Sequence, residues 1–290
     1  MKLAISNIAW NTALEPQVAD RLAELGVTGV EVAPSKVHPT PLAATNAELD
    51  RYREFWAARG IEVVGMQALL FGQNDLHLFR EADSRKAMRD YLAGICRFAG
   101  RLGARSLVFG SPKNRQRGEL PLDQAQSIAI DFFGDLGRVA ASEGVWLCIE
   151  HNPTVYGADF VTTAAEALDL VRAVNQPGFG LHLDTGGFTL TGESLEPLAQ
   201  AGAWWRHFHI SEPNLAAIGG EDLSDPATLA GLPNEETTRH TRYAAAVRDS
   251  GYSGWLSLEM KTLPDDQCLA AVTRAVEFAR ACYEDSATPL

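Results

Sequence analysis

The sequence predicts an α/β protein of one domain, a (β/α)8 TIM barrel that spans residues 1–290. The first observation behind this prediction is a recurring pattern: a helix-like stretch ends in glycine, and a short apolar run follows. The stretches "RLAELGVTGVEVA" and "AGRLGARSLVFG" both show it. The second observation is the number of such runs. Eight of them, each followed by a helix candidate, occur in a chain of the usual length for this barrel.

The predicted strands are almost continuously apolar, as parallel strands buried on both faces should be. In chain order they are Leu3–Ser6, Gly29–Ala33, Ile61–Ala68, Ser106–Gly110, Trp146–His151, Phe179–Thr185, Trp205–Ile210 and Gly254–Glu259. A doubly wound open sheet is the alternative, but no GxGxxG motif follows the first strand to support it.

The segments between these runs have helical periodicity. Leu22 and Leu25 fall on one helix face behind Pro16, a residue that suits the first turn of a helix. The stretches "TNAE" (45–48) and "TAAE" (163–166) have the spacing of a capping box, which predicts that a helix begins at each. Helices therefore separate the strands, as a barrel of βα units requires.

Composition restricts the class of protein and its partners. The chain is 46% hydrophobic and 21% charged, which is typical of a soluble globular protein. Its net charge of −12 disfavours nucleic acid and anionic membranes as partners. The four cysteines form no CxxC motif, and no long apolar segment is present, so we expect reduced thiols and a cytoplasmic protein. A homo-oligomer is compatible with the sequence.

Each of the last four predicted strands ends in one metal-ligating side chain. The stretches "CIEHNP", "LHLDTG", "HFHISEP" and "LSLEMK" supply Glu150, Asp184, His209 and Glu259. Chemistry in such barrels occurs at these strand ends. Three carboxylates and an imidazole at one point would be unfavourable without a cation among them. An oxygen-rich set with one nitrogen indicates one divalent ion, Mn²⁺ first, with Mg²⁺, Co²⁺ and Zn²⁺ as alternatives.

A divalent ion at the barrel mouth can bind a carbonyl and its neighbouring hydroxyl and make the α-proton easier to remove. Glu150 and Glu259 flank the expected ion and are candidates for the catalytic acid and base. The expected substrate is a small carbohydrate: a sugar, a sugar phosphate or a related polyol carbonyl compound. Epimerisation, isomerisation and dehydration are all open to this arrangement.

Three further residues are candidates for substrate contacts. Asn152 and Lys261 share strand parity with Glu150 and Glu259, so we expect them to face inward. Trp10 follows the first strand, where an aromatic ring can stack on a sugar.

The stretch "FGSPKNRQRG" places three cations, Lys113, Arg115 and Arg117, just after the fourth predicted strand. Arg offers a planar fork and Lys a mobile charge, so this loop predicts a site for a phosphate or carboxylate on the substrate. The alternative is a solvated loop whose cations pair with nearby Asp and Glu.

Over its whole length the chain resembles the xylose isomerase-like TIM barrels. This family contains sugar phosphate isomerases and epimerases, ketose 3-epimerases, inosose dehydratases and endonuclease IV. The stretches "HFHISEPN" and "LHLDTG" are the closest local matches. The resemblance implies metal binding by Glu150, Asp184, His209 and Glu259, with the two glutamates as the acid and base.

Two positions depart from the ketose 3-epimerase pattern. Those enzymes usually have His where this chain has Gly187, and Arg where it has Leu215. Two other functions therefore stay open beside the isomerase or epimerase: a dehydratase that uses the same pocket, and a metal- or sugar-binding barrel without catalysis.

Overall fold

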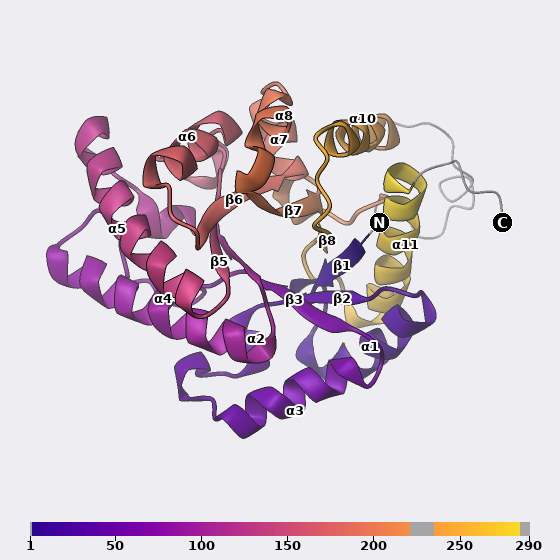
Figure 1. Cartoon of the computed structure of the whole chain (residues 1–290). Helices are drawn as coiled ribbons and strands as arrows, with labels where there is room; N and C mark the ends of the chain where they lie inside the picture. Colours follow the sequence, from indigo (N-terminus) through magenta and orange to yellow (C-terminus); the bar gives the residue numbers. More distant parts are fainter. Residues whose placement is uncertain (1, 221–234, 285–290) are drawn as a thin grey trace.

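The structure is a computed structural model that describes residues 2–220 and 235–284. Eight parallel strands close into a barrel in sequence order, and the last strand pairs with the first (Figure 1). The strands are β1 (Lys2–Ser6), β2 (Gly29–Val32), β3 (Glu62–Met66), β4 (Ser106–Phe109), β5 (Trp146–Glu150), β6 (Phe179–Asp184), β7 (Trp205–Ser211) and β8 (Trp255–Glu259). The (β/α)8 TIM barrel predicted from the sequence is confirmed.

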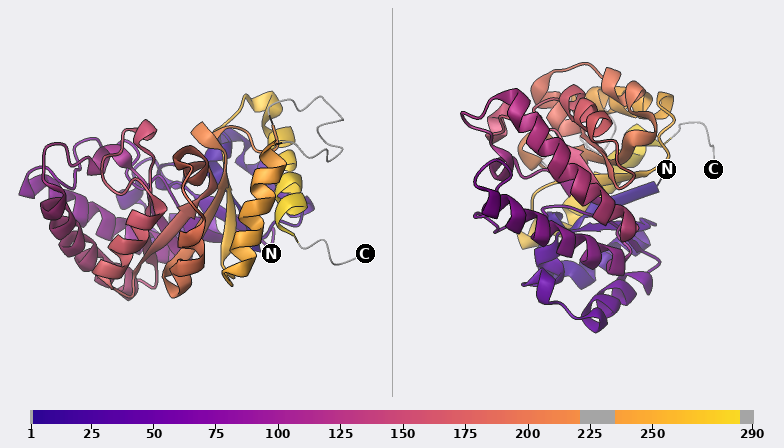
Figure 2. Two further views of the ribbon diagram at one scale, coloured as in Figure 1. Left: turned by 90° about the horizontal axis from the view of Figure 1, so that it is seen from above. Right: turned by 60° about the vertical axis from the view of Figure 1, so that its left-hand side comes forward.

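Helices surround the barrel on its outside. They are α1 (Glu15–Glu24), α2 (Pro34–Val37), α3 (Asn46–Ala57), α4 (Ala82–Leu102), α5 (Leu122–Ser142), α6 (Ala164–Val174), α7 (Thr185–Thr191), α8 (Glu196–Ala201), α10 (Glu235–Asp249) and α11 (Asp265–Tyr283). Two further views show the long helices α4 and α5 side by side on one flank and α10 and α11 together on another (Figure 2).

Local sequence signals explain where several helices begin and end. Thr45 and Glu48 form the predicted capping box at the start of α3, where the Glu48 carboxylate accepts from the Thr45 backbone N–H at 2.8 Å. Thr163 caps α6 through its side chain, which accepts from the backbone N–H of Glu166. Gly103 ends α4 with a φ of 90°, a left-handed conformation that glycine adopts without steric cost.

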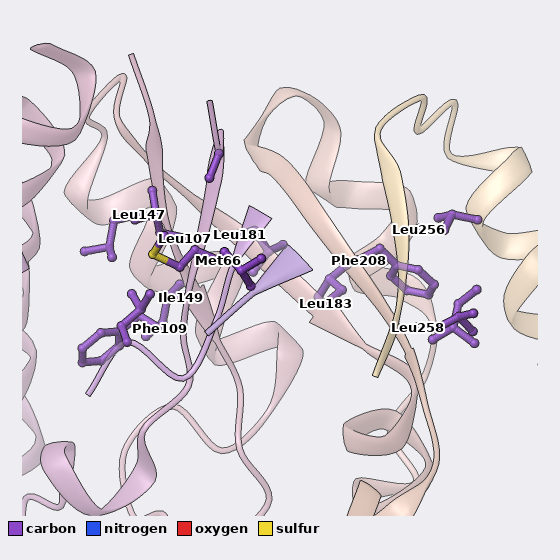
Figure 3. Close-up of a cluster of buried hydrophobic side chains, with 14 of the residues drawn as sticks. Met66, Leu107, Phe109, Leu147, Ile149, Leu181, Leu183, Phe208, Leu256 and Leu258 are labelled. Atoms are coloured by element: carbon purple, nitrogen blue, oxygen red, sulfur yellow. The ribbon is translucent and has the colours of Figure 1, made fainter. Parts of the chain in front are cut away.

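Side chains along each strand point alternately outward, into an apolar layer under the helices, and inward, into a polar interior. The outward side chains pack under the helices; those in Figure 3 include Leu107, Phe109 and Leu181. Phe133 of α5 stacks on Phe179 with ring centroids 4.8 Å apart. Burying a side chain of this size contributes on the order of 1.5–3 kcal/mol. This outer layer holds the barrel closed, so the interior can contain polar groups.

One strand ends earlier than predicted. We expect 61–68 to be extended, but β3 stops at Met66. Ala68 has a φ of 52°, in the left-handed region, and this conformation turns the chain away from the sheet. The turn brings Gln67 and Ala68 to the carboxyl end of the barrel.

The cysteines and the hydrophobic segments agree with the sequence predictions. All four cysteines are free and buried. Within the described ranges, no helix is long and apolar enough to cross a membrane.

Candidate active site

A cavity of about 440 Å³ opens at the carboxyl ends of the strands. Its walls contain three of the four predicted metal ligands, from β5, β6 and β8. The complete lining is Gln67, Ala68, Val108, Gly110, Ser111, Pro112, Glu150, Asn152, Pro153, Tyr156, Asp184, Ser211, Glu212, Asn214, Leu215 and Glu259. The barrel thus brings together side chains that lie more than a hundred residues apart in the sequence.

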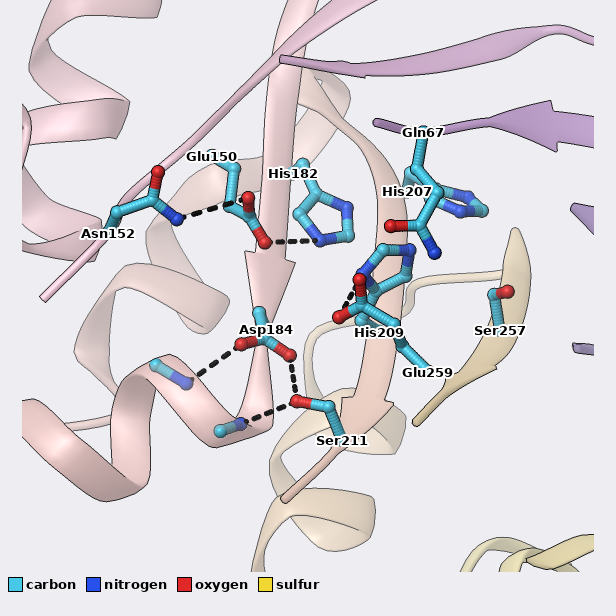
Figure 4. A network of polar contacts seen from close by, with 12 residues as sticks. Gln67, Glu150, Asn152, His182, Asp184, His207, His209, Ser211, Ser257 and Glu259 are labelled. Atoms are coloured by element: carbon cyan, nitrogen blue, oxygen red, sulfur yellow. Dashed lines mark hydrogen bonds and ion pairs between the residues drawn. The ribbon is translucent and has the colours of Figure 1, made fainter. Parts of the chain in front are cut away.

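Glu150, His209 and Glu259 each offer one ligand atom within 4.8 Å of the others. His209 Nδ1 lies 3.1 Å from Glu259 Oε2. Asp184 lies beside this group (Figure 4), where Ser211 donates to one of its oxygens and the Gly187 N–H donates to the other at 2.8 Å. The structure therefore brings all four predicted ligands to one place.

The His209 imidazole compensates the negative charge of the three carboxylates at this site only in part. Burial raises the pKa of Glu150 to about 8, and the charges of Glu259 and Asp184 add to the effect. Burial and the Glu259 charge also raise the pKa of Asp184 to about 6. A divalent cation would remove this penalty. His209 Nδ1 pairs with Glu259 Oε2; burial opposes a charge on the His209 ring, but Glu31 and Glu259 outweigh it and raise its pKa well above the usual value. The donor set therefore fits a metal ion.

Glu31 holds the other nitrogen of His209. Its fully buried carboxylate accepts from His209 Nε2 at 2.8 Å, from His207 Nε2 at 3.0 Å and from the Ser257 hydroxyl at 2.8 Å. Burial opposes the charge of Glu31, but the two histidines outweigh it and hold its pKa below the usual value. A proton on Nε2 leaves Nδ1 free as a ligand, so Glu31 orients His209 for a metal.

His182 lies one layer below Asp184 on β6, at the bottom of the cavity. It is fully buried, and neither ring nitrogen has a hydrogen-bond partner among the described residues. Its Nε2 lies 3.6 Å from Glu150 Oε1 (Figure 4). Burial lowers its pKa well below the usual value, and the neighbouring His209 and His207 contribute. The neutral imidazole therefore lies next to Glu150 without adding charge.

Two glycines make room around these groups. A β-carbon at Gly110, after β4, would lie 2.3 Å from Glu150 Oε2. A β-carbon at Gly187, on α7, would lie 2.5 Å from His151 Nε2. His151 is buried and points away from the cavity toward Phe188, as the alternation of side chains along β5 requires. The residue that fills the space beside position 187 is thus His151.

Asn152 lines the cavity as predicted, but its side chain is already bonded. Its Nδ2 donates to Glu150 at 3.1 Å, and its Oδ1 accepts from Arg115 at 2.9 Å. Asn152 therefore positions Glu150.

The basic loop lines the cavity through Gly110, Ser111 and Pro112, but its three cations do not reach it. Arg115 is fully buried and donates to the backbone carbonyls of Phe109 and Glu150. Arg117 donates to the carbonyls of Asp159 and Leu120, and Lys113 is exposed. None of the three cations lines the cavity. Both arginines donate to backbone carbonyls of the protein itself. These bonds use the donors that would otherwise bind a substrate anion.

Two other predicted contacts lie away from the cavity. Lys261 is exposed; β8 ends at Glu259, so strand parity no longer applies two residues later. Trp10 is buried against Trp56 of α3, with ring centroids 6.4 Å apart. It packs under the first βα loop.

The sequence analysis missed two side chains of this site. Ser211, two residues after His209, donates to Asp184 and accepts from the Gly186 N–H at 3.0 Å. Its parity with His209 was a usable signal. Tyr156 lines the cavity from the loop after β5, where no periodicity indicates direction.

The chain belongs to the xylose isomerase-like TIM barrel family, which matches residues 19–282. A search of curated proteins gave no match. Three similar solved structures are all epimerases.

D-psicose 3-epimerase from Clostridium cellulolyticum H10, solved with D-tagatose, is 17% identical with a TM-score of 0.76, and the match covers 98% of this chain and 100% of that one. For 3-keto-D-glucoside 4-epimerase from E. coli the identity is 14% and the TM-score 0.72, over 96% and 98% of the two chains. For L-ribulose 3-epimerase the identity is 16% and the TM-score 0.70, over 99% of each chain. At these identities the likeness establishes the fold.

Proposed function

We propose that this protein is a divalent-metal-dependent epimerase of an uncharged sugar, which acts through an enediolate. The observation that carries the proposal is the pair of carboxylates Glu150 of β5 and Glu259 of β8, which line one cavity and offer ligand atoms within 4.8 Å of each other and of His209. Similarity to epimerases in fold supports the proposal.

Glu150, Asp184, His209 and Glu259 would hold the ion, with Mn²⁺ as the first choice for an oxygen-rich set with one nitrogen. When bound, the ion would polarise a substrate carbonyl and its neighbouring hydroxyl and so lower the pKa of the α-proton. The chain itself supplies the orientation: Glu31 holds His209, and Ser211 with the Gly187 N–H holds Asp184.

The two glutamates would move the proton. One carboxylate takes the α-proton from one face of the substrate, and the other returns a proton to the opposite face, which inverts the carbon. General acid–base steps of this kind contribute about 10²–10⁴ in rate each. Return to the neighbouring carbon would give isomerisation; two carboxylates from different strands, β5 and β8, can instead serve the two faces of the substrate, and the fold likeness to epimerases supports inversion. Asn152 keeps Glu150 in place while it exchanges the proton.

An uncharged substrate follows from the cavity walls. None of the described residues that line the cavity is Lys, Arg or His. Residues 221–234, outside the described part, also contain none of these three types in their sequence. A phosphate brought next to Glu150, Asp184 and Glu259 would be repelled, because the only cationic groups beside these carboxylates would be the ion and His209, which they already engage. The proposal therefore specifies a free sugar.

Exchange of the α-proton in D₂O tests this function. The Mn²⁺-loaded protein should incorporate deuterium into at least one of D-psicose, D-tagatose, D-fructose and L-ribulose, and should interconvert that sugar with its epimer. The chelator-treated protein is the control and should do neither. No exchange with any free ketose, or faster exchange with a ketose phosphate than with the free ketose, would contradict the proposal.

A further inference from the structure

Most polar side chains in the cavity wall already have hydrogen-bond partners. Asn152 bonds to Glu150 and Arg115, and Ser211 bonds to Asp184. The Glu212 carboxylate accepts from Arg239 and from His240, at 2.6 Å each. These groups shape the cavity, but their hydrogen-bonding capacity is largely used within the protein.

Tyr156 differs, because its hydroxyl keeps a free proton. The hydroxyl oxygen accepts from the Asn214 backbone N–H at 2.7 Å, and no described acceptor takes the phenol proton. A phenol both donates and accepts, so the bond from Asn214 leaves it as a donor. Burial raises its pKa, and the charges of Asp184 and Glu259 add to this, so the proton stays on the oxygen.

The surrounding loops fix the ring in place. Tyr156 ends a short 3-10 turn, η5 (Thr154–Tyr156), whose ends are closed by bonds from the Tyr156 N–H to the Pro153 carbonyl and from the Gly157 N–H to the Thr154 carbonyl, at 2.9 Å each. Its neighbour Val155 is 68% exposed, so the turn sends that side chain to solvent and Tyr156 to the cavity.

The hydrogen bond from the Asn214 N–H to the Tyr156 hydroxyl crosses the mouth of the barrel. Asn214 lies after β7 and has a φ of 59°, a left-handed conformation that Asn tolerates better than most residues. This conformation presents its N–H to Tyr156, which lies after β5. The bond therefore joins the loops on both sides of β6, the strand that ends in Asp184.

We propose that Tyr156 is a substrate-binding residue that donates a hydrogen bond to a hydroxyl oxygen of the sugar, remote from the reacting carbons. This inference rests on the proposed function. The side chains of Glu150 and Glu259 are only 12% and 10% exposed, whereas Tyr156 is half-buried and forms the outer wall. A chain of several hydroxylated carbons bound at the carboxylates would extend outward past this phenol.

The test is Tyr156→Phe, which keeps the ring and removes the donor. We expect its Kd and KM for D-tagatose to rise about three- to tenfold, the effect of losing one neutral hydrogen bond. The value of kcat and the bound Mn²⁺ should stay within twofold of the wild type. Dihydroxyacetone shares the carbonyl and its neighbouring hydroxyl but lacks the outer carbons, so its Ki as a competitor should not change.

Tyr91→Phe, on α4 away from the cavity, is the matched control and should leave all four quantities unchanged. Unchanged Kd and KM in Tyr156→Phe, or an equal rise in the Ki of dihydroxyacetone, would overturn the inference. A wild type that binds D-tagatose without α-proton exchange would overturn the proposed function alone, and the Kd comparison would still decide the role of Tyr156. A wild type that does not bind D-tagatose would overturn the role assigned here to Tyr156.

Discussion

The cavity contains two groups of carboxylates whose charges are stabilised to different extents. We call Glu31 and its histidine partners the floor, and Glu150, Asp184 and Glu259 the rim. At the floor, the Glu31 carboxylate has three donors, two of them histidines, and its negative charge is stabilised. At the rim, Glu150, Asp184 and Glu259 face one another, and two of them have raised pKa values. The protein's own donors stabilise the charge of Glu31, whereas His209 compensates the three carboxylates only in part; the proposed metal ion would supply the rest.

The proton-transfer pair should give the largest effect. Glu150→Gln and Glu259→Gln keep one ligating oxygen and remove the base, so we expect kcat to fall by about 10²–10⁴ while Mn²⁺ affinity changes less. Steady-state kinetics and metal analysis of each variant check this. One variant should still exchange the α-proton without inverting the carbon.

Glu119→Gln, at an exposed position outside the cavity lining, is the control for both and should behave as the wild type. Near-native turnover in both cavity variants would contradict the two-carboxylate mechanism.

The metal-free rim should make stability depend on pH. The folded-state pKa of Glu150 is about 8, and an unfolded Glu titrates near 4.5. Between these values the native state holds a proton that the unfolded state has released, so the free energy of unfolding falls as pH rises. We expect this Glu150 contribution to fall by about 2 kcal/mol from pH 5.5 to 7.5 in chelator, measured as the difference in Tm between the wild type and Glu150→Gln.

Glu150→Gln should reduce this loss, and saturating Mn²⁺ should remove it, because the ion compensates the charge directly. The same pH dependence of Tm in metal-free wild type and Glu150→Gln would show that the rim charges are compensated in another way.

Removing the Glu31 carboxylate should weaken metal binding at Glu150, Asp184, His209 and Glu259. Glu31→Gln takes away one acceptor, so His209 is no longer held with its proton on Nε2, and we expect Mn²⁺ affinity to fall about 10- to 100-fold. Calorimetric titration of Mn²⁺ measures this without reference to turnover. Glu15→Gln is the matched control, because Glu15 is also a buried carboxylate but accepts from Tyr52, outside the cavity lining. Equal Mn²⁺ affinity in Glu31→Gln and the wild type would show that Glu31 does not contribute to metal binding.

The smallest effect is expected in the basic loop. Lys113 is exposed and does not line the cavity, so Lys113→Ala should change KM by less than twofold for D-tagatose and for D-fructose 6-phosphate. A rise of fivefold or more for the phosphate alone would restore the anion site that the sequence predicts and would contradict an uncharged substrate.

The sequence predicts the barrel and its ligand quartet because both follow from strand periodicity. Buried parallel strands are apolar runs, and the last residue of a strand must lie at the mouth, as Asp184 and Glu259 do. Alternation also predicts the outward direction of His151.

Residues beyond the strand ends are less predictable, because loop geometry depends on distant contacts. Arg115 is drawn inward by carbonyls at Phe109 and Glu150, and nothing in its local sequence specifies these partners. Tyr156 faces the cavity because of a 3-10 turn and a bond to Asn214, 58 residues later. Lys261 lies two residues beyond the end of β8, where the alternation of side chains along the strand no longer predicts their direction, and it is exposed.

Gly110 also restricts how this barrel can evolve. Any β-carbon there would collide with the Glu150 carboxylate, at 2.3 Å, and a β-carbon at Gly187 would collide with His151. A new ligand or substrate contact at either position therefore requires the Glu150 carboxylate or the His151 ring to move. We expect single mutations that change specificity to occur in the outer loops that contain Tyr156 and Asn214. The carboxylates Glu150, Asp184 and Glu259 should stay unchanged.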